Sequence, residues 1–149
     1  MFTIEEHIES LINHISKVRN NCLLLGKKFI KNGNTRMGID LIARGHIHDI
    51  TKFRGTEWEH LHRGENIPKD KIQLAINHHA STNDHHPEYH DGFENMPKVA
   101  IAELAADWLA RSQEFGSDIK IWIRETAISK FKLIQVGKII SFLCTVLVC

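Results

Sequence analysis

The chain has 149 residues, so we expect one compact domain over residues 1–149. Hydrophobic residues make up 42% of the chain, which is too large a share for a disordered protein. The formal net charge of +1 excludes the strong basic excess with which proteins bind nucleic acid non-specifically. Histidine stands out, because there are 11 of them and nine fall within residues 46–90.

The cysteines and the two ends of the chain indicate a cytoplasmic protein. Cys22, Cys144 and Cys149 are an odd number without a CxxC pair, which argues against a disulfide framework or a cysteine zinc site. The first residues lack the basic and then apolar pattern of a signal peptide. The apolar stretch 139–149 is too short to cross a bilayer, so we expect no transmembrane segment.

Two helices are predicted in the first third of the chain. Apolar residues recur every three or four positions over residues 4–29, as on one face of a long amphipathic helix. Thr3 and Glu6 have the spacing of a capping box at its start, and an Asn-Gly-Asn sequence at 32–34 ends it. A second helix is expected over residues 35–50.

The middle of the chain predicts two more helices and a long loop. Thr56 and Glu59 have the spacing of a second capping box, which predicts a short helix there. Pro68 suits the first turn of a helix that runs to about His79. Residues 80–96 are rich in Ser, Asn, Asp, Pro and Gly, and a loop of that length in a compact domain is usually functional.

A helix over residues 97–115 and an apolar C-terminal helix over residues 118–149 complete the chain. No segment shows sustained strand alternation. We therefore expect an all-α protein, a compact helical bundle of about six helices. The apolar end of the last helix is a candidate contact for a homo-oligomer.

The dipeptide His48-Asp49 lies at the centre of the histidine-rich region. Neighbouring helical residues point about 100° apart, but near a helix end both side chains can reach one metal ion. Imidazole and carboxylate together suit divalent ions such as Mn, Fe, Ni, Zn or Mg, with one or two ions per chain. Chance explains the dipeptide better than a metal site does when it is taken alone, so other residues have to support the assignment.

Further histidines and an aspartate recur at positions that favour a metal site. The alternatives are an ordinary hydrogen-bonded core histidine at position 14, and a surface ion pair between Asp107 and Arg111. Chance explains each of these histidines and aspartates when it is taken alone, but it explains their joint occurrence less well, which favours a metal site. The candidate metal ligands are His14, His48, Asp49, His79, His85, His86 and Asp107.

The order of these residues resembles known metal-binding signatures. His14, the His48-Asp49 pair and Asp107 resemble the signature of the HD-domain phosphohydrolase superfamily. His79 and the His85-His86 pair resemble the additional ligands of the two-metal HD-GYP phosphodiesterases, although the chain has no Gly-Tyr-Pro motif. The sequences at 48–53, 85–89 and 107–112 are similar to a family of small phage and bacterial proteins related to HD domains.

The resemblance implies an HD-like helical fold and a metal-dependent phosphohydrolase. A metal-activated hydroxide would cleave a nucleotide or cyclic nucleotide, as a phosphomonoesterase or a phosphodiesterase. His14, His48, Asp49 and Asp107 would hold one ion, whereas His79, His85 and His86 would hold a second ion or contact the phosphate. Asp49 and Lys52 are the candidate catalytic residues, and Lys52, Arg44 and Glu88 are the candidate contacts to a small phosphorylated substrate.

Two other functions stay open. A phage accessory or regulatory protein, located in the host cytoplasm, would bind metal and nucleotide without turnover. A structural or assembly protein, in which the histidines pack or pair with one another, would bind no metal at all.

Overall fold

The computed structural model describes residues 3–63 and 66–130, and all the regular secondary structure in this part is helical, which confirms the predicted all-α class. Short 3-10 and π-helical turns join the helices. No helix among the described residues is long and apolar enough to span a membrane. The α-helices are α1 (Ile4–Lys31), α2 (Thr35–Ile47), α3 (Gly55–Glu57), α4 (Lys69–Thr82), α5 (Lys98–Glu114), α6 (Ile119–Trp122) and α7 (Ile128–Lys130).

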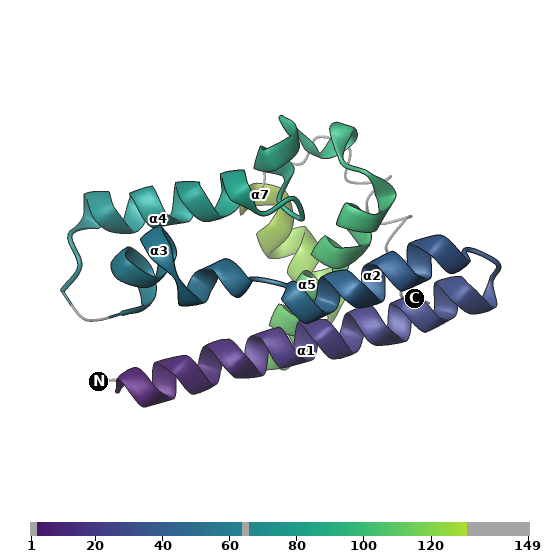
Figure 1. Ribbon diagram of the computed structural model, residues 1–149, viewed down its shortest axis with the longest axis horizontal. Helices are drawn as coiled ribbons and strands as arrows, with labels where there is room; N and C mark the ends of the chain where they lie inside the picture. Colours follow the sequence, from purple (N-terminus) through teal and green to yellow (C-terminus); the bar gives the residue numbers. More distant parts are fainter. Residues whose placement is uncertain (1–2, 64–65, 131–149) are drawn as a thin grey trace.

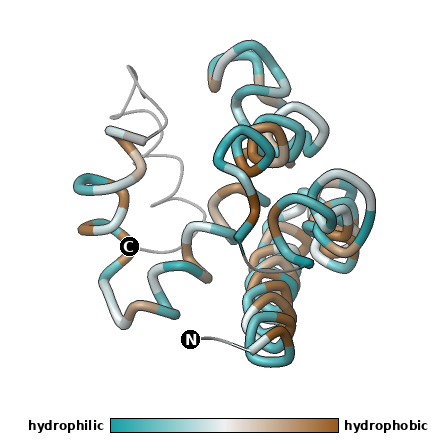
Figure 2. Tube along the Cα trace, turned by 90° about the vertical axis from the view of Figure 1, so that its left-hand side faces the viewer, coloured by the Kyte–Doolittle hydropathy of each residue, from teal (hydrophilic) through white to brown (hydrophobic). Residues whose placement is uncertain are grey.

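Helices α1 and α2 form an antiparallel pair along one side of the molecule, and α3 and α4 lie toward the N-terminal end of α1 (Figure 1). The predicted capping box starts α1, because Glu6 N–H donates to Thr3 Oγ1 and Thr3 N–H donates to Glu6 Oε2. In Figure 2, which looks nearly along α1, hydrophobic residues recur turn after turn on its coil. This repeat is the apolar stripe that the sequence predicts.

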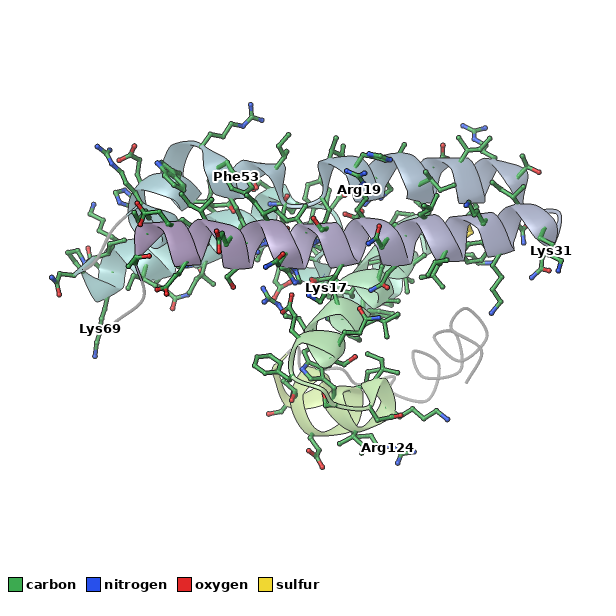
Figure 3. The ribbon with its side chains drawn as sticks, turned by 90° about the horizontal axis from the view of Figure 1, so that it is seen from below. Lys17, Arg19, Lys31, Phe53, Lys69 and Arg124 are labelled. Atoms are coloured by element: carbon green, nitrogen blue, oxygen red, sulfur yellow. The ribbon has the colours of Figure 1, made fainter. Side chains whose placement is uncertain are left out.

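Helix α5 is central to the packing, because two sides of it are buried against different helices. One hydrophobic cluster joins it to α1 and α2, through residues that include Val18, Leu41 and Ala106. A second cluster joins α5 to the segment from α6 to α7, through residues that include Trp108 and Ile123. Figure 3 shows that segment projecting from the middle of α1. Two polar side chains of α5, Glu103 and Ser112, are therefore buried inside the protein.

Several predicted boundaries differ from the structure. Helix α2 ends at Ile47 and not at residue 50, because Asp49 adopts the left-handed conformation with φ 55°. The capping box at Thr56 is wrong, since no side chain caps this helix and Glu59 pairs with Arg63 instead. Helix α4 continues to Thr82, so the long loop starts three residues later than expected.

The C-terminal helix is only partly described. Asp118 caps it by accepting a hydrogen bond from the backbone N–H of Lys120. The helix then passes through a π-helical turn at Ile123–Ala127 to Lys130. Residues 131–149, which carry the predicted apolar oligomer contact, lie outside the described residues.

Glycines allow the close approach of α1 and α2, and one of them gives a test of the packing. A Cβ on Gly45 would lie 2.6 Å from Cys22 Cβ. We expect Gly45→Ala to lower the free energy of unfolding by about 1–3 kcal/mol, because one backbone has to move. The same change in an open helix would raise stability by up to about 1 kcal/mol. Urea unfolding measures whether the free energy of unfolding falls or rises in Gly45→Ala. A rise would contradict this close packing of α1 and α2.

Candidate metal centre

The seven predicted metal ligands come together where α2 ends. His14 is on α1, His79 is on α4 and Asp107 is on α5, while the other four lie at the end of α2 and in the loop after α4. One ligand atom from each member of three overlapping sets lies within 4.8 Å of the others. The sets are Asp49, His79, His85 and His86; His14, His48 and Asp49; and His48, His85 and Glu103.

Asp49 is shared by the first two sets. Its Oδ1 lies 3.3 Å from His79 Nε2 and 3.4 Å from His85 Nε2. Its Oδ2 lies 3.4 Å from His48 Nε2 and 2.6 Å from Lys52 Nζ. The side chain is almost fully buried. The left-handed backbone at Asp49 ends α2 directly before the carboxylate and brings both oxygens among the histidines.

The inward-facing atoms of this cluster are buried and lack hydrogen-bond partners. They include Nε2 of His14, His48, His85 and His86, and Oδ1 of Asp49 and Asp107. His14 Nε2 and Asp107 Oδ1 lie 3.0 Å apart, but not in hydrogen-bond geometry. A buried polar atom without a partner is costly, so native proteins rarely keep one. A divalent cation would satisfy imidazole nitrogens and carboxylate oxygens together, so the donor set fits a metal ion.

Three glutamates fix the orientation of the histidines, and one of them, Glu103, is also a member of the third ligand set. His14 Nδ1 donates to Glu114 Oε1 at 2.9 Å, and His48 Nδ1 donates to Glu103 Oε1 at 2.8 Å. His79 Nδ1 donates to Glu57 Oε2 at 2.7 Å. An ionised carboxylate only accepts, so Nδ1 carries a hydrogen in each pair, and Nε2 faces the cluster with a lone pair whenever the ring is neutral. Carboxylates commonly hold metal-binding histidines in this way.

The carboxylates of the cluster are ionised. Burial raises the pKa of Asp49, but the nearby charges of His48 and Lys52 outweigh it and hold that pKa well below its usual range. Burial also raises the pKa of Asp107, but the close approach of His14 and the charge of His48 reverse this and leave it lowered. The same balance lowers the pKa of Glu103, chiefly through its hydrogen bond from His48. These charges provide strong attraction for a cation.

Two histidines of the loop after α4 are neutral at pH 7. Burial, followed by the charge of His48, lowers the pKa of His85 to about 3. Burial and the charge of His79 lower the pKa of His86 to about 4. Their Nε2 atoms are therefore free of protons or easily freed, as a metal ligand requires. His48 differs, because Asp49 and Glu103 raise its pKa against the effect of burial.

A cavity of about 420 Å³ opens beside the cluster. His79 and His86 lie at its wall, together with the predicted substrate contacts Lys52 and Glu88. Arg44 does not line this cavity. It donates to Asp84 Oδ2 at 2.9 Å and to Glu103 Oε2 at 2.6 Å, so it supports the glutamate that holds His48.

Residues 3–137 match a family of unknown function, DUF5662. The chain belongs to this family. No curated protein and no solved structure matches the chain. The range matched to DUF5662 contains all seven candidate ligands and the three glutamates behind them.

Sequence reasoning missed several residues of this DUF5662 site. Glu103 and Glu114 lie at helical spacing from the predicted ligand Asp107 on α5, and this acidic stripe was a usable signal for both. Glu57 had no such signal, because only the packing of α3 against α4 brings it to His79. Arg111 was weighed as a partner of Asp107, but it pairs with Glu114 at 3.0 Å and lines the cavity.

The glutamate behind His79 provides a test of how these supports act. We expect Glu57→Gln to weaken divalent-metal binding by roughly 10–100-fold, because the amide no longer fixes the hydrogen on His79 Nδ1. Metal titration followed by calorimetry measures the change. Glu59→Gln is the matched control, since Glu59 is exposed, lies two residues after Glu57 and pairs with Arg63. Equal affinities in both variants would contradict the role of Glu57.

Proposed function

We propose that this DUF5662 protein is a divalent-metal-dependent phosphohydrolase that acts on a small phosphate ester. The observation that carries the proposal is the convergence of partnerless Nε2 and carboxylate oxygen atoms on one buried point, next to a cavity that holds cationic side chains. This combination joins a place for metal ions to a place for an anionic substrate.

The residues divide into two sets around Asp49. One set joins Asp49 to His14 and His48, and the other joins it to His79, His85 and His86. Asp107 adjoins the first set, because its Oδ1 lies 3.0 Å from His14 Nε2. A shared carboxylate between two sets of nitrogen and oxygen donors suits a pair of divalent ions. Ions bound there would acidify a water molecule and offset the charge of the phosphoryl oxygens.

The protein's own cations would orient the ester. Lys52 is almost fully buried, contacts Asp49 and lines the cavity, so its ammonium group lies at the boundary between ligand cluster and cavity. Arg111 lines the same cavity from α5. Both groups are positioned to donate to phosphoryl oxygens, whose charge grows during phosphoryl transfer.

The resemblance to HD-domain proteins supports the same reaction class and makes nucleotides and cyclic nucleotides the first substrates to test. Phosphomonoesters and phosphodiesters belong in the same panel. The wall of the cavity combines these cations with the apolar side chains of Leu11, Leu61 and Ile76, which suits an ester with an organic group better than free phosphate.

The test has two measurements on protein purified without chelator and without a nickel column. Elemental analysis should find at least one divalent ion per chain, and the panel of phosphate esters should yield phosphate. Chelation should lower the rate at least about 100-fold, and added Mn²⁺ or Fe²⁺ should restore it. Bound metal and bound nucleotide without phosphate release would reject the enzyme in favour of a binding protein, and absence of metal binding would reject both.

A further inference from the structure

A pair of stacked histidines, His7 and His62, belongs to none of the three ligand sets and lines the cavity beside the candidate metal centre. His7 Nε2 and His62 Nδ1 lie 2.9 Å apart, and the ring centroids are 5.1 Å apart. The His62 side chain is about 6% exposed, and its Nε2 is buried without a hydrogen-bond partner. A buried imidazole nitrogen that lines a cavity and has no partner is available to a ligand.

This pair lies outside the three candidate ligand sets. His7 precedes His14 by seven residues on α1, which corresponds to about 10 Å along the helix axis. His62 ends the π-helical turn Trp58–His62. Both histidines line the cavity together with His79 and His86.

His62 is a neutral group and not a second anion site. Burial, with the charges of Lys52 and His7, lowers the pKa of His62 to about 4. The two rings share one hydrogen between His7 Nε2 and His62 Nδ1, so His62 Nε2 takes the complementary role of donor or acceptor. A neutral polar group in the part of a ligand away from its phosphate would therefore hydrogen-bond to His62 better than a second phosphate would.

We infer that the cavity is the substrate site for a compact phosphate monoester, in which His62 Nε2 hydrogen-bonds a neutral polar group of the organic part. The inference rests on the proposed function for the place of the phosphate. A volume of about 420 Å³ lies in the lower part of the range for small-molecule sites, and so fits one ring-sized organic group. His62 is then a specificity-determining residue, whereas the metal centre binds the part common to all substrates.

Non-hydrolysable phosphonates test the site by binding alone. We use methylphosphonate, benzylphosphonate and 4-hydroxybenzylphosphonate with the Mn²⁺-loaded protein and measure affinities by calorimetry. The hydroxybenzyl compound should bind at least about tenfold more tightly than methylphosphonate, and more tightly than the benzyl compound. Equal affinity for all three would overturn the inference.

The decisive variant is His62→Phe, which keeps a ring and removes both nitrogens. It should abolish the preference for the hydroxyl and leave methylphosphonate affinity and metal content unchanged, while His62→Gln should restore part of the preference. His60→Phe is the matched control, since His60 lies in the same turn and is not part of the cavity wall. A hydroxyl preference that survives in His62→Phe would overturn the inference.

A second variant keeps the test valid if the His62 variants fail to fold. Ile76 is 45% exposed and lines the cavity, so Ile76→Trp should fold and fill the space for the organic group. It should weaken hydroxybenzylphosphonate binding at least about tenfold and spare methylphosphonate. Unchanged binding would overturn the site. Phosphate release that does not depend on His62 or Ile76 would overturn this inference and leave the proposed function standing. Selective phosphonate binding without any turnover would support this inference and overturn the proposed function.

Discussion

Asp49→Asn is expected to abolish divalent-metal binding, with a loss of affinity of at least about 100-fold. Asp49 is the carboxylate between the two ligand sets, with one oxygen toward His79 and His85 and the other toward His48 and Lys52. An amide removes the negative charge that draws a cation there and puts N–H hydrogens among the imidazoles. Loss at a supporting residue already costs roughly 10–100-fold, and this residue is a direct candidate ligand. Elemental analysis and metal titration measure the effect.

Asparagine is the right replacement because it tolerates the left-handed conformation that residue 49 adopts, whereas alanine would add backbone strain. Asp91→Asn is the matched control. Asp91 is also left-handed, with φ 56°, but it is exposed and belongs to no ligand set. Full metal content and full phosphate release in Asp49→Asn would refute both the metal centre and the proposed reaction.

The metal-free protein is expected to lose stability steeply as the pH falls from about 7 to about 4. Burial lowers the pKa of His62 and His86 to about 4 and that of His85 to about 3. Below pH 6.5 the unfolded chain binds protons on these residues and the folded chain does not, so the free energy of unfolding falls with pH. At pH 5 each contributes a loss of about 2 kcal/mol at most. The raised pKa of His48 opposes this loss, because the stability that charged His48 adds to the folded protein is fully present below pH 6.5.

Urea unfolding at several pH values, with a chelator present, checks this expectation. The lowered pKa values of Asp49, Asp107 and Glu103 add a further loss below about pH 4.5, because stability from these groups is present only while they are ionised. His86→Gln should flatten part of the curve, and the exposed His46→Gln should leave it unchanged. A free energy of unfolding that is constant from pH 7 to pH 5 would contradict the neutral, buried state of these histidines.

The sequence predicted well those features that depend on local patterns. The periodicity and the capping box placed α1. Residue type and chain order selected six side chains that lie in the overlapping sets, and a seventh, Asp107, that lies beside His14. That they bind metal stays a prediction. A helix end at His48 was expected only in general terms, since nothing in the local sequence specifies the left-handed residue that follows.

Features that depend on tertiary packing could not be predicted. Arg44 looked like a free cation for phosphate, but its position between Asp84 and Glu103 is set by how α2 lies against α5. His62 could not be recognised from the sequence, because its burial depends on the turn after α3 packing near α1. In both cases the chemistry of the residue was evident and its neighbours were not.

The hydrogen bond from His14 to Glu114 joins residues 100 positions apart. During synthesis at roughly 5–20 residues per second, His14 therefore leaves the ribosome about 5–20 s before its partner exists. The α1–α2 pair can pack in that interval, with His14 and His48 already close and the α5 side still open. The nascent chain thus exposes half of the candidate metal centre before the helix that encloses it has been made.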